Sequence, residues 1–192
     1  MPRRLLGGTL SDFLNDLAER HHDQTALTFG EDRRTFGQLP RRLNVVRSAC
    51  TALEPLLEQT GVVLAVENVL PGPATELVRL LLPDVDPQHF GFCYDSSHDQ
   101  IGGPRPFGLL ADLRDRVHAV HLSDRVREFV DHVPPGEGFI DWPALCQVLR
   151  TSSLSGPLLF EVMTLHAAEK DPASLLPQVY ARAVDLHRQI YG

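Results

Sequence analysis

The chain has 192 residues, of which 43% are hydrophobic and 22% are charged, and its 18 Lys and Arg against 25 Asp and Glu give a net charge of −7. This length supports one domain with a substantial core, and the composition excludes a disordered chain, a collagen-like repeat and a coiled coil. Because an acidic surface repels phosphate backbones and anionic lipids, we expect neither a nucleic-acid nor a membrane partner.

The cysteines and the chain start favour a cytoplasmic protein. Three widely spaced cysteines, Cys50, Cys93 and Cys146, form no CxxC motif, which is typical of reduced thiols in a core. The basic start lacks the apolar stretch of a signal peptide. No apolar run reaches the roughly 18 residues of a membrane helix.

The first 60 residues have the pattern of a helix, a hairpin and a second helix. Ser11 and Asp12 can cap a helix whose apolar positions recur every three or four residues. Residues 25–29 and 34–36 flank a glycine-containing turn, which predicts a short β-hairpin. Residues 38–58 carry apolar side chains at helical spacing and predict a long helix.

From Gly61 onward, strand and helix patterns alternate. Short apolar runs occupy residues 62–66, 90–94, 117–120 and 157–160. Helical periodicity fills residues 74–82, 107–116, 142–149 and 172–189. Nearly continuous apolar strands that alternate with helices predict an α/β fold with a parallel sheet buried on both faces.

Each apolar run leads into a polar side chain that can bind a metal, namely Glu67, Asp95, His121 and Glu161. The carboxyl ends of parallel strands lie at one edge of the sheet, where active sites are built. Three carboxylates and one imidazole suit Mn²⁺, Mg²⁺ or Fe²⁺, with Zn²⁺ also possible, and we expect no cysteine among the ligands. Singly, each residue is more often a cap or a structural polar group. Only their occurrence on four successive strands favours a shared site.

Five segments together resemble the second half of the xylose-isomerase-like TIM barrels, over residues 40–192. They are Val-Leu-Ala-Val-Glu-Asn (63–68), Gly-Phe-Cys-Tyr-Asp-Ser-Ser-His (91–98), Val-His-Leu-Ser-Asp (120–124), His-Val-Pro-Pro-Gly-Glu-Gly-Phe-Ile-Asp-Trp (132–142) and Leu-Leu-Phe-Glu-Val (158–162). That family includes sugar phosphate isomerases and epimerases, hydroxypyruvate isomerases, ketose 3-epimerases and endonuclease IV. A complete barrel has eight βα units. The resemblance therefore implies a half barrel of four parallel βα units, preceded by the helix–hairpin–helix segment, with domains over residues 1–45 and 46–192.

The resemblance also implies roles for individual residues. The four polar residues at the strand ends would be the metal ligands, and Glu67 and Glu161 would also be the acid and base of catalysis. His98, Arg127 and His132 would bind substrate. The implied reaction is proton transfer next to the carbonyl of a small keto-sugar or hydroxy-keto acid, through an enediolate, with Mn²⁺ as the first candidate metal.

Two further resemblances carry less weight. His132 also matches a histidine that binds additional metal in the endonuclease-like branch, but Val130 stands where that branch has an aspartate. Residues 9–45 resemble the start of an AMP-forming adenylating enzyme, through Leu10–Gly30, Arg34–Leu39 and Arg42–Asn44. The chain has no Ser/Thr/Gly-rich phosphate loop, so we do not expect adenylation.

Two main alternatives remain open at the level of sequence. The chain is either a metal-dependent isomerase or epimerase, or a non-catalytic relic or binding module that keeps the ligands. An endonuclease and an adenylating-enzyme fragment are the less favoured alternatives. Four strands of a barrel have two open edges, which favour association, so we also expect a homodimer that joins two half barrels.

Overall fold

The structure, a computed structural model, describes residues 20, 23, 25–29, 32–35, 38–69, 73–99, 105–127 and 131–192. The chain forms two compact units, one of residues 1–63 with 71–89 and the other of residues 64–70 with 90–192. The predicted division between residues 45 and 46 stays a prediction. The helix predicted from Ser11 lies outside the described residues.

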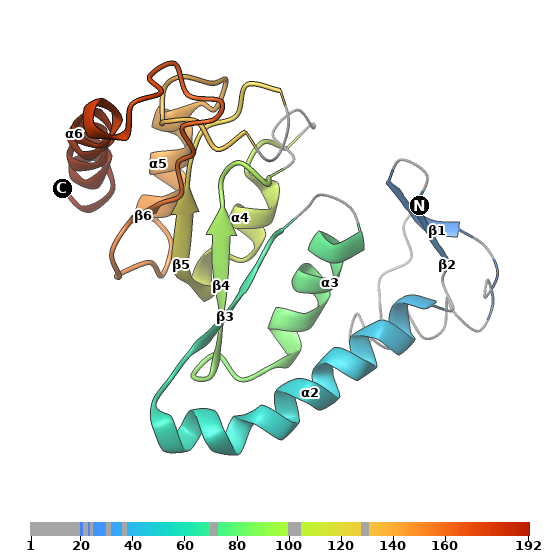
Figure 1. The fold of residues 1–192 in the computed structure, drawn as a ribbon. Helices are drawn as coiled ribbons and strands as arrows, with labels where there is room; N and C mark the ends of the chain where they lie inside the picture. Colours follow the sequence, from blue (N-terminus) through green and yellow to red (C-terminus); the bar gives the residue numbers. More distant parts are fainter. Residues whose placement is uncertain are drawn as a thin grey trace. The chain divides into compact units, whose positions relative to one another are not determined.

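The first unit contains the hairpin and two helices (Figure 1). Its elements are β1 (Thr25–Phe29), β2 (Asp32–Thr35), α2 (Gln38–Thr60), α3 (Pro73–Leu81) and the 3-10 turn η1 (Leu82–Asp84). Strands β1 and β2 pair antiparallel, as predicted. Helix α2 ends at a left-handed Gly61, whose N–H donates to the Leu57 carbonyl at 2.8 Å. An ion pair between Arg47 and Asp84 joins α2 to η1.

The second unit is built on a four-stranded parallel sheet, as the sequence predicted. The strands are β3 (Leu64–Glu67), β4 (Phe90–Asp95), β5 (Val117–Leu122) and β6 (Leu159–Phe160), in the spatial order β3-β4-β5-β6. Each pairs in parallel with its neighbour. Consecutive parallel strands that lie side by side are the arrangement found in a TIM barrel.

The helices of this unit follow the strands along the chain. They are α4 (Gly108–Asp112), the 3-10 turn η2 (Arg114–Arg116), α5 (Trp142–Arg150) and α6 (Pro172–Tyr191). The single helix predicted over residues 107–116 is interrupted at Leu113, whose φ of −109° and ψ of 15° are not helical. The Asp141 and Asp171 carboxylates cap α5 and α6. No helix in the described ranges is long and apolar enough to cross a membrane.

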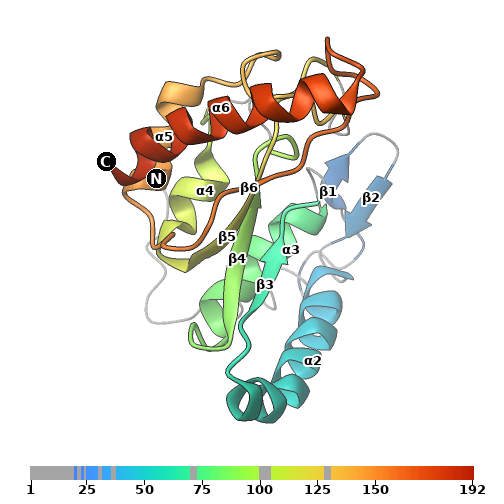
Figure 2. The same cartoon turned by 60° about the vertical axis from the view of Figure 1, so that its left-hand side comes forward.

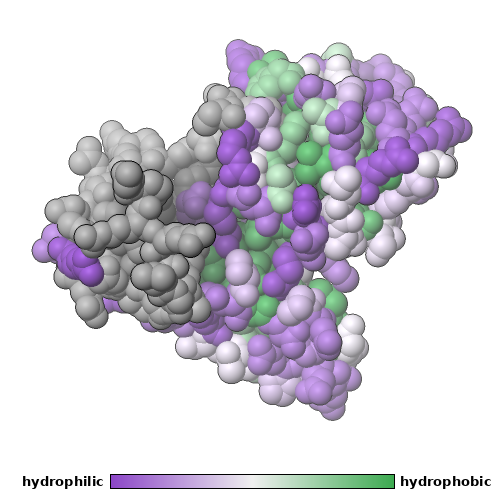
Figure 3. Space-filling model, turned by 180° about the vertical axis from the view of Figure 1, so that it is seen from behind, coloured by the Kyte–Doolittle hydropathy of each residue, from purple (hydrophilic) through white to green (hydrophobic). Residues whose placement is uncertain are grey.

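The two faces of the sheet differ in chemistry. Helices α4 and α5 lie on one face of the sheet (Figures 1 and 2). The side chains of Phe92, Tyr94 and Leu122 are completely buried. Because side chains alternate along a strand, Cys93 and Asp95 point to the face opposite that of Phe92 and Tyr94. The surface seen from behind combines hydrophilic side chains with narrower hydrophobic areas (Figure 3). The large apolar side chains of β4 thus form the core, and the opposite face is left for the polar residues.

Candidate metal centre

The four predicted metal ligands meet at the carboxyl edge of the sheet. Glu67 ends β3, Asp95 ends β4, His121 lies one residue before the end of β5, and Glu161 directly follows β6. His121 Nδ1 lies 3.6 Å from Glu67 Oε1 and 3.2 Å from Glu161 Oε2. Ligand atoms of Asp95, His121 and Glu161 all lie within 4.8 Å of one another. The structure therefore brings these four side chains together around the imidazole of His121.

The Asp95 carboxylate is oriented by the turn that follows it. Its Oδ1 accepts from the Ser97 N–H at 2.8 Å, the Ser97 hydroxyl at 3.0 Å and the His98 N–H at 3.1 Å. These three donors hold one carboxylate oxygen, and Oδ2 is directed to the remaining side of the group. Since Asp95 is completely buried, it forms the floor of the site.

Asn68 joins β3 to β4 immediately beside the ligands. Its Oδ1 accepts from the Asp95 N–H at 2.8 Å, and its Nδ2 donates to the Asp95 carbonyl at 2.9 Å. The Asn68 side-chain amide thereby makes the hydrogen bonds to the Asp95 backbone that a continuation of strand β3 would otherwise make. Asn68 is 1% exposed, so no bulk water replaces these bonds. The sequence interpretation missed this residue, although it directly follows Glu67.

Three buried polar atoms converge on the site without a hydrogen-bond partner among the described residues: Asp95 Oδ2, His98 Nδ1 and His121 Nδ1. His98 Nδ1 lies 3.5 Å from both Asp95 Oδ2 and Glu67 Oε1. Buried polar atoms in folded proteins nearly always have a partner, so a cluster of such atoms requires an explanation. Carboxylate oxygens and imidazole nitrogens at these separations are a donor set that a divalent cation fits.

Solvent reaches the site from the side of the glutamates. The side chains of Glu67, His121 and Glu161 are 26%, 28% and 40% exposed. Asp95, by contrast, has no exposed surface. A small molecule would therefore meet the two glutamates first and the aspartate last.

His98 and His132 also lie at this edge. Their rings meet edge to face with centroids 5.1 Å apart, and with Asp95 they form a second group that could hold a metal ion. His132 Nδ1 lies 3.1 Å from the Ser123 hydroxyl and 3.4 Å from that of Ser97. The structure thus places both histidines beside the predicted ligands, and their roles toward a substrate stay predictions.

Arg127 is placed differently. It is exposed, and its backbone N–H donates to Asp131 Oδ2 at 2.6 Å. Within the described residues, no hydrogen bond or ion pair joins its guanidinium to the metal-binding cluster. Its predicted role as a substrate contact stays a prediction.

The arginine that the structure buries beside the site is Arg125. Its Nη1 donates to the carbonyls of Ser97 and Asp99 at 2.9 and 3.1 Å, and its guanidinium lies 5.0 Å from the Phe139 ring centroid. Burial lowers the pKa of this group, and neighbouring carboxylates, Asp99 foremost, oppose that effect. Arg125 thus fixes the turn that carries Ser97 and His98.

Asp124 organises the loop that follows β5. Its Oδ1 accepts from the N–H groups of Arg125 at 2.8 Å and Ile140 at 3.1 Å. Its Oδ2 accepts from the Gly136 N–H and from Trp142 Nε1, both at 2.8 Å. Asp124 has no exposed surface, so this carboxylate is a structural centre of the loop that begins at His132. The sequence signal for it was the Asp that closes His-Leu-Ser-Asp, and the interpretation did not use it.

Cys93 lies beside the predicted ligands. It is a free, buried thiol, as predicted, but it faces the site: ligand atoms of Glu67, Cys93 and His121 lie within 4.8 Å of one another. Burial, followed by the charges of the nearby carboxylates, raises the pKa of its thiol to about 12. Strand register sets Cys93 directly beside Glu67, and the expectation that no cysteine is among the ligands stays a prediction.

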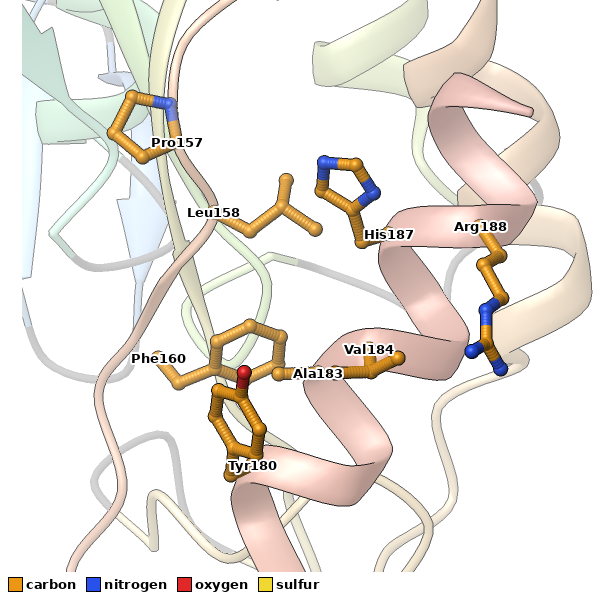
Figure 4. A pocket seen from close by; sticks show the side chains of 8 residues that line it. All are labelled: Pro157, Leu158, Phe160, Tyr180, Ala183, Val184, His187 and Arg188. Carbon is orange, nitrogen blue, oxygen red and sulfur yellow. The ribbon is translucent and has the colours of Figure 1, made fainter.

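A separate groove lies between β6 and α6 and has a volume of about 410 Å³ (Figure 4). The side chains that line it are Pro157, Leu158, Phe160, Tyr180, Ala183, Val184, His187 and Arg188. None of the predicted site residues lines this groove.

Comparison with known proteins supports the same architecture. The xylose isomerase-like TIM barrel family matches residues 16–180, which extends the resemblance beyond the predicted start at residue 40. Two solved structures are similar: the apo form of the 3-keto-D-glucoside 4-epimerase YcjR from E. coli (TM-score 0.59, 22% identity) and a D-tagatose 3-epimerase-like protein (TM-score 0.58, 16% identity). The alignments cover 82% and 77% of this chain but 57% and 56% of those chains.

The matches to curated relatives cover a smaller share of those proteins than the matches to solved structures do. They include the uncharacterized protein y4fM of Sinorhizobium fredii, 27% identical over 72% of this chain and 43% of that protein. Inosose dehydratases of Clostridium perfringens and Geobacillus kaustophilus are 30% and 28% identical over 56% of this chain, and over 40% and 38% of their own lengths. The resemblance of residues 9–45 to adenylating enzymes stays a prediction. The chain spans about two fifths of these relatives, and it belongs to the xylose isomerase-like TIM barrel family.

Proposed function

We propose that the cluster of Glu67, Asp95, His121 and Glu161 binds a divalent cation and that the protein transfers a proton at the carbon next to the carbonyl of a small polyhydroxylated substrate. The observation that carries this proposal is the convergence of Asp95 Oδ2, His98 Nδ1 and His121 Nδ1, all buried and without hydrogen bonds in the described part of the chain. Two partly exposed glutamates lie beside them.

Mn²⁺ is the ion that we propose first. Three carboxylates and one imidazole form a mainly oxygen donor set, which favours Mn²⁺, Mg²⁺ or Fe²⁺ over ions that prefer sulfur. When bound, the cation supplies a Lewis acid that polarises the substrate carbonyl.

The glutamates are the proposed acid and base. Glu67 and Glu161 lie 3.6 and 3.2 Å from His121 Nδ1 and are the carboxylates of the cluster that are open to solvent. In the proposed reaction one carboxylate takes the proton from carbon, and one returns it to the same or a neighbouring position. Asp95, held by the turn of residues 95–98, lies at the floor of the site.

The substrate class follows from chemistry that the matched proteins share. Their names refer to an inosose, a 3-keto-D-glucoside and D-tagatose, which are all polyhydroxylated carbonyl compounds. Epimerisation of a carbon beside a carbonyl and dehydration across it both begin when a proton leaves that carbon. We therefore propose a keto-sugar, a keto-polyol or a hydroxy-keto acid as substrate.

Metal binding is the first test. Mn²⁺ should raise the thermal midpoint of the chelator-washed protein, because a ligand that binds only the folded state stabilises it by mass action. Glu161→Gln should lose most of this shift, whereas Glu58→Gln, on the exposed surface of α2, should keep it. An unchanged midpoint of the parent protein with Mn²⁺ would overturn the proposed metal site.

Proton exchange is the second test. A keto-sugar incubated with the Mn²⁺-loaded protein in D₂O should gain deuterium next to its carbonyl, as read by NMR. Glu67→Gln should abolish this exchange while the fold persists, and Glu58→Gln should not affect it. Metal binding without exchange would instead favour the non-catalytic module, and cleavage of abasic DNA would favour the endonuclease-like branch.

Self-association is a further part of this proposal. Strands β3 and β6 are the edges of the four-stranded sheet, and Leu64 and Leu159 on them are 37% and 52% exposed. An unpaired edge with exposed apolar side chains favours pairing with another chain. We therefore propose a homodimer through these edges. Sedimentation at micromolar concentration should detect it, and a monomer with full exchange activity would contradict it.

A further inference from the structure

We propose that Cys93 is an additional ligand of the metal centre, and that its sulfur lets the site accept thiophilic ions such as Zn²⁺ and Co²⁺ beside Mn²⁺. This inference depends on the metal site of the proposed function. It adds a donor of a different chemical class to the four that the sequence pattern indicated.

Strand register brings the sulfur to the site. Cys93 lies directly opposite Glu67 in the β3–β4 pair, and Asp95 lies directly opposite His121 in the β4–β5 pair. Residues two apart on a strand point to the same face, so Cys93 and Asp95 share the face of the site. The ligand atoms of Glu67, Cys93 and His121 lie within 4.8 Å of one another.

These separations suit a common ion. A Zn²⁺ ion binds sulfur at about 2.3 Å and carboxylate oxygen or imidazole nitrogen at about 2.0–2.2 Å, so two donors of a tetrahedral site lie about 3.5 Å apart. His121 Nδ1 and Glu67 Oε1 are already 3.6 Å apart, and the Cys93 sulfur lies within 4.8 Å of a ligand atom of each residue. The sulfur of Cys93 and the carboxylate of Glu67 can therefore contact one ion together with His121.

Independent observations point to a ligand at this place. His121 Nδ1 and Asp95 Oδ2 are buried and have no hydrogen bond in the described residues, and Asp95 is completely buried. Cys93 itself is 4% exposed and forms no disulfide. Its sulfur lies among groups that have no hydrogen bond in the described part of the chain.

Coordination would deprotonate the Cys93 thiol and would change which ions the site prefers. The S–H bond breaks, a metal–sulfur bond forms, and the proton passes to solvent, since a coordinating thiol is deprotonated. Thiolate is a soft donor that favours Zn²⁺ and Co²⁺ over Mg²⁺ and Mn²⁺. Removing it should therefore reduce the preference for soft ions and leave binding of hard ions nearly unchanged.

Titration with Co²⁺ tests the proposal, because a thiolate bound to this ion gives a near-ultraviolet charge-transfer band that oxygen and nitrogen ligands do not give. Wild type should develop the band to one equivalent. Cys93→Ser should lack it but still bind Co²⁺ in calorimetry through the other ligands. Cys146→Ser removes another buried thiol outside the cluster and is the matched control, so it should keep the band.

Competition between ions gives a second measurement. The affinity ratio of Zn²⁺ over Mn²⁺ should fall about tenfold or more in Cys93→Ser, because loss of a group that only orients a ligand already costs about ten- to a hundredfold and Cys93 is proposed as a ligand itself. If Cys93→Ser does not fold, the double variant Cys50→Ser/Cys146→Ser retains Cys93 as its single cysteine and must still show the band.

The outcomes separate this inference from the proposed function. Binding of Co²⁺ without the band in wild type would overturn the role of Cys93 and leave the proposed function standing. Absence of both Co²⁺ and Mn²⁺ binding in wild type would overturn the two together. A band that persists in Cys93→Ser would also contradict the assignment.

Discussion

Replacing Asn68 by alanine tests how the chain orients its metal ligands. The substitution removes two hydrogen bonds, one from the Asp95 N–H at 2.8 Å and one to the Asp95 carbonyl at 2.9 Å. A hydrogen bond between uncharged groups contributes about 0.5–1.5 kcal/mol, so the two together contribute about 1–3 kcal/mol. We expect the free energy of unfolding of Asn68→Ala to fall by that amount.

The same substitution should weaken metal binding more than stability alone explains. Without Asn68, the end of β4 is no longer fixed to β3, and the Asp95 carboxylate loses its defined position. Changes to groups that orient metal ligands typically reduce affinity about ten- to a hundredfold. Calorimetry with Mn²⁺, at a temperature where the variant remains folded, measures this effect.

Asn44→Ala is the matched control, because Asn44 is exposed on α2. It removes the same side-chain amide and should lower neither stability nor Mn²⁺ affinity. The reasoning is refuted if Asn68→Ala unfolds at the same urea concentration as wild type. It is also refuted if the variant loses stability but binds Mn²⁺ with unchanged affinity, since Asn68 would then hold the fold without orienting the ligand.

Three further predictions concern the surroundings of the site. Asp124→Asn should lower the free energy of unfolding by about 2–4 kcal/mol, because an amide can accept from fewer of the four N–H groups that donate to the Asp124 carboxylate. Urea unfolding followed by the fluorescence of Trp142 measures the change. Tyr94→Phe should lower the free energy of unfolding by about 1–2 kcal/mol, since the Tyr94 hydroxyl donates to Asp99 Oδ2 at 2.9 Å. A free energy of unfolding equal to that of wild type would contradict a contribution from this hydrogen bond. Burial raises the pKa of the Cys93 thiol from 9.0 to about 12, so the unfolded chain loses this proton first, and stability should fall between pH 9 and pH 12. Cys93→Ala should show a shallower fall in urea titrations over that range, and equal slopes would contradict the assignment.

The strands were predictable because short apolar runs leave a strong signal in sequence. The predicted burial of the sheet on both faces holds only for β4, since β3, β5 and β6 have partly or fully exposed side chains. Apolar runs at 62–66, 90–94 and 117–120 correspond to β3, β4 and β5 within a few residues. The fourth run was predicted over residues 157–160, but only Leu159 and Phe160 pair with β5. Pairing depends on the neighbouring strand, and a single run carries no information about where its partner ends.

The candidate site was predictable from pattern at residues that lie at or next to strand ends, His121 among them, and from the family resemblance at His98 and His132. Glu67, Asp95 and Glu161 are polar side chains at the ends of apolar runs, so position alone marked them. Asn68 and Asp124 act through partners 27 and up to 18 residues away, which no local pattern specifies. Cys93 gave no signal either, because a thiol fits a core and a metal site equally well.

Register in the β3–β4–β5 ladder sets the core and the metal ligands at once. Side chains alternate with a period of two, so a slip of one residue in β4 would exchange Phe92 and Tyr94 with Cys93 and Asp95. A misregistered sheet would bury charge and have no donors from β4 at its edge. The proposed metal binding would therefore report correct strand pairing, and recovery of a Mn²⁺-dependent signal during refolding would show when the central strand reaches its native alignment.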